Sequence, residues 1–252
     1  MQVGLIGAGN MARALARGWG DPVLCCDAGS GRARALAQEL GGEAVDGPAA
    51  VAERADLVVL CHKPAQLDSV ASEVAPSGKP IASVLGGVTI SALQSAYPGV
   101  DVFRLMPNTP VEVRRGVTCI SVAPDVDAEL EAEVMKLFSR TGIVAPIEER
   151  QQGAAAAAMG VSPAYMALVA EAQVDAAVRY GLKPALASQL VVETMSGTAA
   201  LLESRGYDTL AVRREVASPG GSTARGLAAL ERAGVRAAFQ DAADAVLNEG
   251  NG

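Results

Sequence analysis

The residues best suited to chemistry stand near the start of the chain. Residues 7–12 read GAGNMA and directly follow a short apolar run, Gln2–Ile6. This order matches the fingerprint of dinucleotide binding, in which the first glycine permits a tight turn and the second lets a diphosphate approach the backbone. The alternative is a tight turn that binds no ligand. The cofactor-binding residues predicted from this motif are Ile6, Gly7, Ala8, Gly9, Asn10 and Met11.

An acidic residue follows the second apolar run, Val23–Cys26. Asp27 stands 20 residues after Gly7, where an acid commonly accepts a hydrogen bond from the ribose 2′-hydroxyl and favours NAD. Ser30, Arg32 and Arg34 follow closely, and they could hold the 2′-phosphate of NADP or form a solvated helix face. The residues therefore leave NADH and NADPH both open.

A basic pair follows the buried run Leu57–Cys61. In parallel sheets the carboxyl ends of strands face the cofactor crevice, so Lys63 could lie near the cofactor or merely cap the sheet edge. His62 is the only histidine. It could act as an acid or base, or serve a structural role at the end of the strand.

Alternating strands and helices are needed to position these residues. Helical spacing is evident in Asn10–Gly18, Gly31–Leu40 and Asp127–Arg140. Buried strands that alternate with helices indicate a parallel sheet covered on both faces. The further expected strands are Pro80–Leu85, Val100–Leu105, Val117–Val122 and Gly142–Ile147.

The chain changes character after Glu148, and no strand is expected beyond it. Alanine, the strongest helix former, dominates this part. Because small side chains bury little area, we expect a second copy of the chain to supply the missing burial. The sequence thus predicts an α/β Rossmann-like domain over 1–148 and an all-α dimerisation and substrate domain over 149–252. The expected helices span about 150–160, 163–180, 183–204, 207–216, 222–233 and 235–249.

Composition excludes several classes of function. The 252 residues carry a net charge of −7 and only 3% aromatic residues, which disfavours a nucleic-acid binder. The four cysteines lack zinc-site spacing, so no metal site is expected. No apolar run approaches the ~20 residues that span a bilayer, and no secretory signal is evident. We therefore expect a cytoplasmic protein that acts on a small molecule, without a nucleic-acid or membrane partner.

Six stretches together resemble pyrroline-5-carboxylate reductases, which catalyse the last step of proline biosynthesis. Two of them, MPNTP and SPGGST, are far more specific than the glycine motif. They occur in the order and at the spacing of the family over nearly the whole chain. The matching stretches are LIGAGNMA at 5–12, KP at 63–64, GGVTI at 86–90, RLMPNTP at 104–110, SPAY at 162–165 and SPGGSTA at 218–224.

The resemblance implies NADPH- or NADH-dependent reduction of the C=N bond of 1-pyrroline-5-carboxylate, a cyclic imino acid, to L-proline. It also implies a homodimer interleaved through the C-terminal helices, often assembled further into a decamer. Thr223 would be the catalytic hydrogen-bond or proton donor at the imine nitrogen. Substrate-binding roles fall on Ser162, Ser218, Gly220, Gly221 and Ser222, and further cofactor-binding roles on Asp27, Ser30, Lys63, Pro64, Gly86, Gly87 and Asn108. Without the resemblance, Ser218 would be read as a helix N-cap and Thr223 as a first-turn residue.

One stretch departs from the family pattern. Where the family usually has DAxTAxSGSGPAY, residues 153–165 read GAAAAAMGVSPAY. The Asp and Thr are replaced by Gly153 and Ala156, and two serines by Met159 and Val161. This less polar wall leaves open a reductase of another cyclic imine, such as the six-membered homologue, or a non-catalytic dinucleotide-binding regulator. A hydroxyacid dehydrogenase is disfavoured, because no lysine lies between Lys136 and Lys183 to act as the base.

Overall fold

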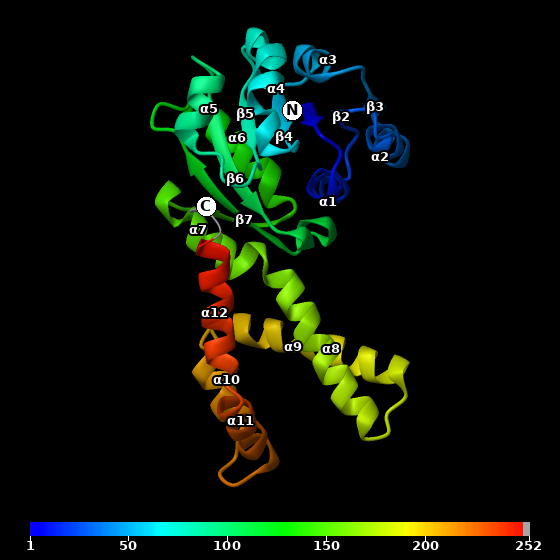
Figure 1. The fold of residues 1–252 in the computed structure, drawn as a ribbon, viewed down its shortest axis with the longest axis vertical. Coiled ribbons are helices and arrows are strands. Elements are labelled where there is room, and N and C mark those ends of the chain that lie inside the picture. Colours follow the sequence, from blue (N-terminus) through cyan, green and yellow to red (C-terminus); the bar gives the residue numbers. More distant parts are fainter. Residues whose placement is uncertain (249–252) are drawn as a thin grey trace. The chain divides into compact units, whose positions relative to one another are not determined.

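The structure, a computed structural model, describes residues 1–248 and divides into two compact units. The first unit, Met1–Pro163, contains a sheet and the helices that cover it. The second unit starts at Ala164 and contains helices alone over its described residues. Figure 1 shows the first unit in blue to green and the second in green to red. The predicted α/β Rossmann-like fold followed by helices is confirmed.

An eight-stranded sheet forms the centre of the first unit. Its strand order is β3-β2-β1-β4-β5-β6-β7-β8, so the chain crosses from β3 to β4 past β2 and β1. The carboxyl ends of β1 and β4 are neighbours at this crossover, where ligands bind in such sheets. The strands are β1 Val3–Ile6, β2 Leu24–Cys26, β3 Glu43–Ala44, β4 Leu57–Leu60, β5 Ile81–Ser83, β6 Val102–Pro107, β7 Gly116–Val122 and β8 Gly142–Pro146.

The sheet is parallel except where β7 runs against β6. Only a short 3₁₀ segment, η3 (Thr109–Val113), connects these two strands. A parallel pair needs a crossover of roughly a dozen residues or more, and this connection is too short for one. A full crossover returns between β7 and β8, which are parallel and joined through α6 (Ala128–Ser139).

Helices cover both faces of the sheet, each over its own apolar core. Neighbouring strand residues alternate between the cores, as a pleated strand requires: Leu5 belongs to one and Ile6 to the other. The first core holds Trp19 and Phe138, whose rings meet edge to face at 5.4 Å. It lies under α1 Asn10–Trp19, α2 Arg32–Leu40 and α6, and the second core lies under α3 Pro48–Arg54, α4 Leu67–Val74 and α5 Ile90–Ala96.

Residues 149–163 pack on the sheet unit, although the sequence prediction placed the domain division after residue 148. They form η4 (Glu149–Gln151), α7 (Gln152–Ala155) and a π-helical turn, η5 (Ala156–Gly160). The buried Gln152 donates from Nε2 to Ser121 Oγ at 2.9 Å. Such bonds tie the segment to the strands, so the compact units separate only after Pro163.

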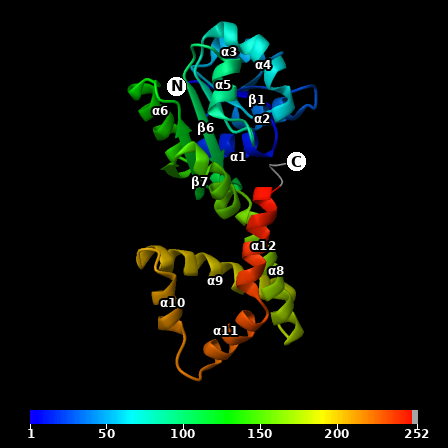
Figure 2. The same cartoon turned by 60° about the vertical axis from the view of Figure 1, so that its left-hand side comes forward.

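The second unit is a set of helices that bury little within the chain. The division between the two units, at residues 163–164, falls within the first of these helices, α8. The structure describes α8 and α9 completely. No residue of α8 is buried, and Ala187 is the only buried residue of α9. Tyr165 packs against Phe239 with ring centroids 6.5 Å apart. The helices are α8 Ser162–Arg179, α9 Pro184–Ser204, α10 Thr209–Val216, α11 Ser222–Arg232 and α12 Val235–Asn248 (Figure 2).

Two helical stretches are long and apolar enough to cross a membrane, by length and composition alone. They are Glu149–Arg179 and Pro184–Ser204, which contain 18-residue windows with mean hydropathies of 1.4 and 1.2. Neither stretch is an unbroken apolar run, which is why the sequence predicts no membrane span. Averaged over 18 residues, alanine counts as apolar and up to two charged residues are tolerated.

Candidate functional site

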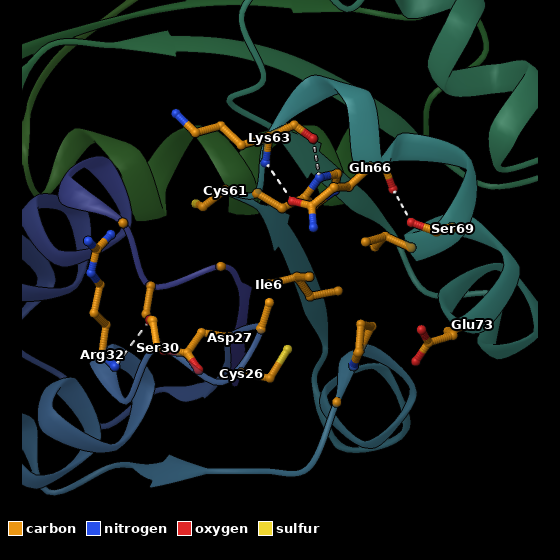
Figure 3. A pocket seen from close by; sticks show the side chains of 18 of the residues that line it. Ile6, Cys26, Asp27, Ser30, Arg32, Cys61, Lys63, Gln66, Ser69 and Glu73 are labelled. Carbon is orange, nitrogen blue, oxygen red and sulfur yellow. Dashed lines mark hydrogen bonds between the residues drawn. The ribbon is translucent and has the colours of Figure 1, made fainter.

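A cavity of about 800 Å³ opens at the carboxyl ends of β1, β2 and β4, a size typical of cofactor sites. It is the place where the order of strands reverses. Figure 3 shows residues from several elements around it, among them Asp27, Ser30 and Lys63. Nine predicted cofactor-binding residues line it, namely Ile6, Gly7, Ala8, Gly9, Asn10, Met11, Asp27, Ser30 and Lys63.

The glycine turn forms one wall of this cavity. Gly7 has φ 98°, and a Cβ built there would lie 2.7 Å from the carbonyl oxygen of Cys61. Gly9 has an ordinary φ of −73°, and a Cβ there would meet nothing within 4 Å. Gly9 also caps α1 without a side-chain hydrogen bond. The first amides of α1 are therefore free to bind an anion in the open space beside Gly9.

The Asp27 carboxylate follows β2 at the same cavity and is held by its own loop. Oδ1 accepts from the amide of Gly29 at 3.0 Å. Oδ2 accepts from Ser30 Oγ at 2.6 Å and from the amide of Ala33 at 3.0 Å. The hydrogen bond from Ser30, joined by those amides, lowers the pKa of Asp27 below its ordinary value. The carboxylate is therefore ionised and fixed in position near neutral pH.

His62 and Lys63 follow the end of β4 and line the cavity. The amide of Lys63 donates to Gln66 Oε1 at 3.2 Å, which begins the 3₁₀ turn η1 (Pro64–Gln66). His62 Nδ1 lies 2.9 Å from the carbonyl oxygen of Lys63. Since that oxygen can only accept, Nδ1 carries the proton, and burial lowers the pKa of His62. Its buried Nε2 has no partner among the described residues.

Four predicted cofactor residues do not line this cavity. Pro64 opens η1, and Gly86 and Gly87 form the turn before α5, with Gly87 at φ 77°. Asn108 is buried, and its side chain is committed to the backbone: Oδ1 accepts from the amide of Val117 at 2.8 Å and Nδ2 donates to the carbonyl of Met159 at 3.2 Å. Asn108 thereby ties the π-helical turn to β6 and β7.

Several lining residues were missed from the sequence, among them Gln66, Ser69 and Glu73. Ser69 and Glu73 lie one turn apart on α4, so they share a face. Asp46 was missed because it follows β3, a strand of two exposed residues. Asp46 could have been predicted from its position, because it is an acid close to the carboxyl end of a strand.

The predicted substrate-binding turn lies in the second unit, before α11. Gly220 has φ 69°, and the amide of Gly221 donates to the carbonyl of Ser218 at 3.0 Å. The N-cap of α11 is Gly221 and makes no side-chain hydrogen bond, so the N-cap alternative for Ser218 is wrong. Ser222 and Thr223 are the first residues of α11. Their free amides and hydroxyls are suited to a small carboxylate.

Ser162 belongs to the sheet unit, at the start of α8. Its hydroxyl donates to the carbonyl of Ala158 at 2.6 Å. The oxygen of Ser162 is thereby left as an acceptor. Within residues 1–248, no three His, Cys, Asp or Glu side chains gather as a metal site.

Comparisons with known proteins agree over the length of the chain. The family model for pyrroline-5-carboxylate reductase dimerisation matches residues 149–251, and that for NADP oxidoreductase, coenzyme F420-dependent, matches residues 2–87. The pyrroline-5-carboxylate reductase of Corynebacterium melassecola is 37% identical over 201 residues, which cover 77% of this chain and 74% of the relative. That of Thermus thermophilus is 34% identical over an alignment of 264 residues, covering 100% and 98%.

Superposition on a solved structure points to the same family. The crystal structure of Plasmodium falciparum pyrroline carboxylate reductase with NADP bound superposes with a TM-score of 0.89 at 25% identity. The superposition covers 99% of this chain and 97% of that one. The chain therefore belongs to the pyrroline-5-carboxylate reductase family.

Proposed function

We propose that this protein reduces the C=N bond of 1-pyrroline-5-carboxylate to give L-proline, with NADH or NADPH as reductant. The single observation that carries the proposal is the whole-length similarity to reductases of that name, in a chain whose glycine turn lines a cavity of dinucleotide size. A bound nicotinamide supplies the hydride. The protein must hold and orient the reactants and donate to the ring nitrogen as that nitrogen gains a proton.

The first turn of α1 fits the diphosphate of such a cofactor. Its amides are uncapped, and Gly9 leaves open space in front of them. Asp27 is placed to accept from a ribose hydroxyl, and the Lys63 side chain adds a positive charge to the cavity wall. We assign Pro64, Gly86, Gly87 and Asn108 to the support of this site.

The turn at 218–223 fits the substrate. We assign the carboxylate to the amides at the start of α11, with Ser218, Gly220, Gly221 and Ser222 around it. The Thr223 hydroxyl donates a hydrogen bond to the imine nitrogen. This contact lowers the barrier because the nitrogen becomes more basic as the hydride reaches the neighbouring carbon.

Replacing Thr223 tests this assignment. A hydrogen bond of this kind contributes about 1–3 kcal/mol, so Thr223→Ala should lower kcat/KM by roughly 5- to 150-fold. Thr223→Ser keeps the hydroxyl and should retain most of the activity. Equal activity of the alanine variant and the wild type would contradict the role of Thr223.

A second candidate function comes from the altered wall at residues 153–161. Met159 and Val161 stand where the family usually has serines, which would suit a larger, less polar ring. Parallel turnover assays with the five- and six-membered cyclic imino acids separate the two. Faster turnover of the six-membered ring would favour the alternative. Tight cofactor binding without turnover of either imine would indicate a non-catalytic regulator.

We further propose that two copies pair through the second unit. Its helices leave large apolar side chains exposed, including Leu168, Leu190 and Val192, and the matching family model is one for dimerisation. Charged residues such as Glu171, Asp175 and Glu193 interrupt α8 and α9. Placing these charged side chains in lipid would cost free energy, which favours a protein partner over a membrane. A decamer would be a further assembly of such dimers.

The net charge and the cysteines bear on the partners of the protein and on its cellular compartment. A net charge of −7 disfavours nucleic acid as a partner. The four cysteines are unpaired within the described residues, as is usual in a reducing compartment. We therefore place the protein in the cytoplasm.

A further inference from the structure

The β2–α2 loop encloses an anion that belongs to the chain itself. Asp27 accepts from the amides of Gly29 and Ala33 and from the hydroxyl of Ser30. These donors stand at and just before the start of α2, where uncapped amides commonly bind phosphate. Gly29 and Gly31 have φ of 83° and 76°, conformations that glycine adopts without strain, and they let the loop turn around the carboxylate.

This arrangement removes the donors that a 2′-phosphate on the ribose would need. The phosphate would meet amides already in use and a fixed negative charge at hydrogen-bonding distance, and like charges so close repel. A free 2′-hydroxyl, by contrast, can donate a hydrogen bond to this carboxylate. Ionised carboxylates offer about four acceptor positions, and Asp27 uses three within its own loop, so an acceptor position remains for the hydroxyl.

Arg32, the first residue of α2, is a cation beside this loop. It lines the cavity, whereas Arg34, two residues on, does not. Arg32 makes no ion pair with any described residue. It could therefore pair with a 2′-phosphate once the competing carboxylate is gone.

We propose that Asp27 determines the cofactor specificity of this enzyme: by binding the donors of its own loop as an internal anion, it selects NADH over NADPH. The inference rests on the proposed function, since it takes the cavity to be the site of the nicotinamide cofactor. It adds the residue and the contacts that choose between the two forms.

The test is the equilibrium binding of NADH and NADPH to the full-length protein in the absence of substrate. Nicotinamide fluorescence reports the binding. The wild type should bind NADH more tightly by about tenfold or more. Asp27→Ser, which frees the amides and the Ser30 hydroxyl, should shrink that preference by about tenfold or reverse it. Asp27→Asn, a near-isosteric change, should move it in the same direction.

Matched variants separate the loop contacts from simple charge. Asp46 lines the same cavity but accepts no hydrogen bond from the described residues. Asp46→Asn should therefore change the NADH:NADPH ratio much less than Asp27→Asn. In the Asp27→Ser background, Arg32→Gln should weaken NADPH binding alone, and Arg34→Gln should leave it unchanged.

The outcomes are distinct. Equal or tighter NADPH binding by the wild type would overturn the inference and leave the cofactor site intact. An equal effect of Asp46→Asn and Asp27→Asn would overturn the role of the loop contacts. Failure to bind either nucleotide would overturn the cofactor site and this inference together.

Discussion

Gly7 and Gly9 stand two positions apart and meet different physical needs. Gly7 is required by its left-handed backbone and by the carbonyl of Cys61 behind it, whereas Gly9 faces open space. Both needs were predicted from the motif, because the spacing of the glycines and the strand before them define the turn. The hydrogen bonds of Asp27 could not be predicted, since they depend on how the loop folds around that carboxylate.

Alanine at each glycine should separate stability from binding. Gly7→Ala should lower the free energy of unfolding by about 2 kcal/mol or more, because φ is unfavourable and the methyl meets backbone. Gly9→Ala should leave stability within about 1 kcal/mol but raise the Kd for NADH, since its methyl enters the space of the diphosphate. Urea unfolding and nucleotide titration measure the two effects. An unfolding free energy equal to wild type for Gly7→Ala would contradict the strain.

At the scale of elements, glycine and proline positions gave the helices of the second unit within a few residues. Pro163 and Pro184 lie in the first turns of α8 and α9, as expected of proline. The short β3 and the helices α3, α4 and α5 were not predicted. β3 is two exposed residues and carries no apolar pattern. The α4 wall of the cavity, with Ser69 and Glu73, depends on β4 lying beside β1, which is a property of the sheet order.

Glu149 links the segment after β8 to the rest of the sheet unit. Its Oε1 accepts from Arg104 Nη1 and from the amide of Ile90, both at 2.7 Å. The Arg104 side chain is 13% exposed and that of Glu149 34%, so these bonds are partly shielded from water. Glu149 therefore holds the start of α5 next to β6.

Removing this charge should be costly. Glu149→Gln should lower the free energy of unfolding by about 1.5–3 kcal/mol, the usual worth of hydrogen bonds to a charged group. Glu148 is the matched control: its pair with Arg150 is 64% and 78% exposed. Glu148→Gln should cost less than about 1 kcal/mol. Denaturant midpoints of both variants decide the matter, and equal losses would contradict a special role for Glu149.

At the scale of the whole molecule, the second unit has too little buried surface of its own. Its helices expose leucine, valine and aromatic side chains, which is the kind of surface expected at an interface. The alanine-rich composition predicted this need for a partner. Which side chains would meet a second copy in the proposed dimer depends on the helix packing and could not be predicted from the sequence.

A charge placed on α9 should break the pairing. Leu190 is 49% exposed, and Leu190→Asp should shift the mass in solution toward the 25.5 kDa of one chain. The control, Val113→Asp, alters an exposed apolar residue of the sheet unit and should leave the mass unchanged. Light scattering over a range of concentrations measures both. A wild type that is monomeric throughout would contradict the proposed dimer.

The proposed reaction is tested by turnover of 1-pyrroline-5-carboxylate by the wild-type protein, with NADH and NADPH in parallel. We expect imine-dependent oxidation of the nucleotide, formation of L-proline in equal amount, and a higher kcat/KM with NADH. Nucleotide binding without formation of L-proline would contradict the proposed reaction.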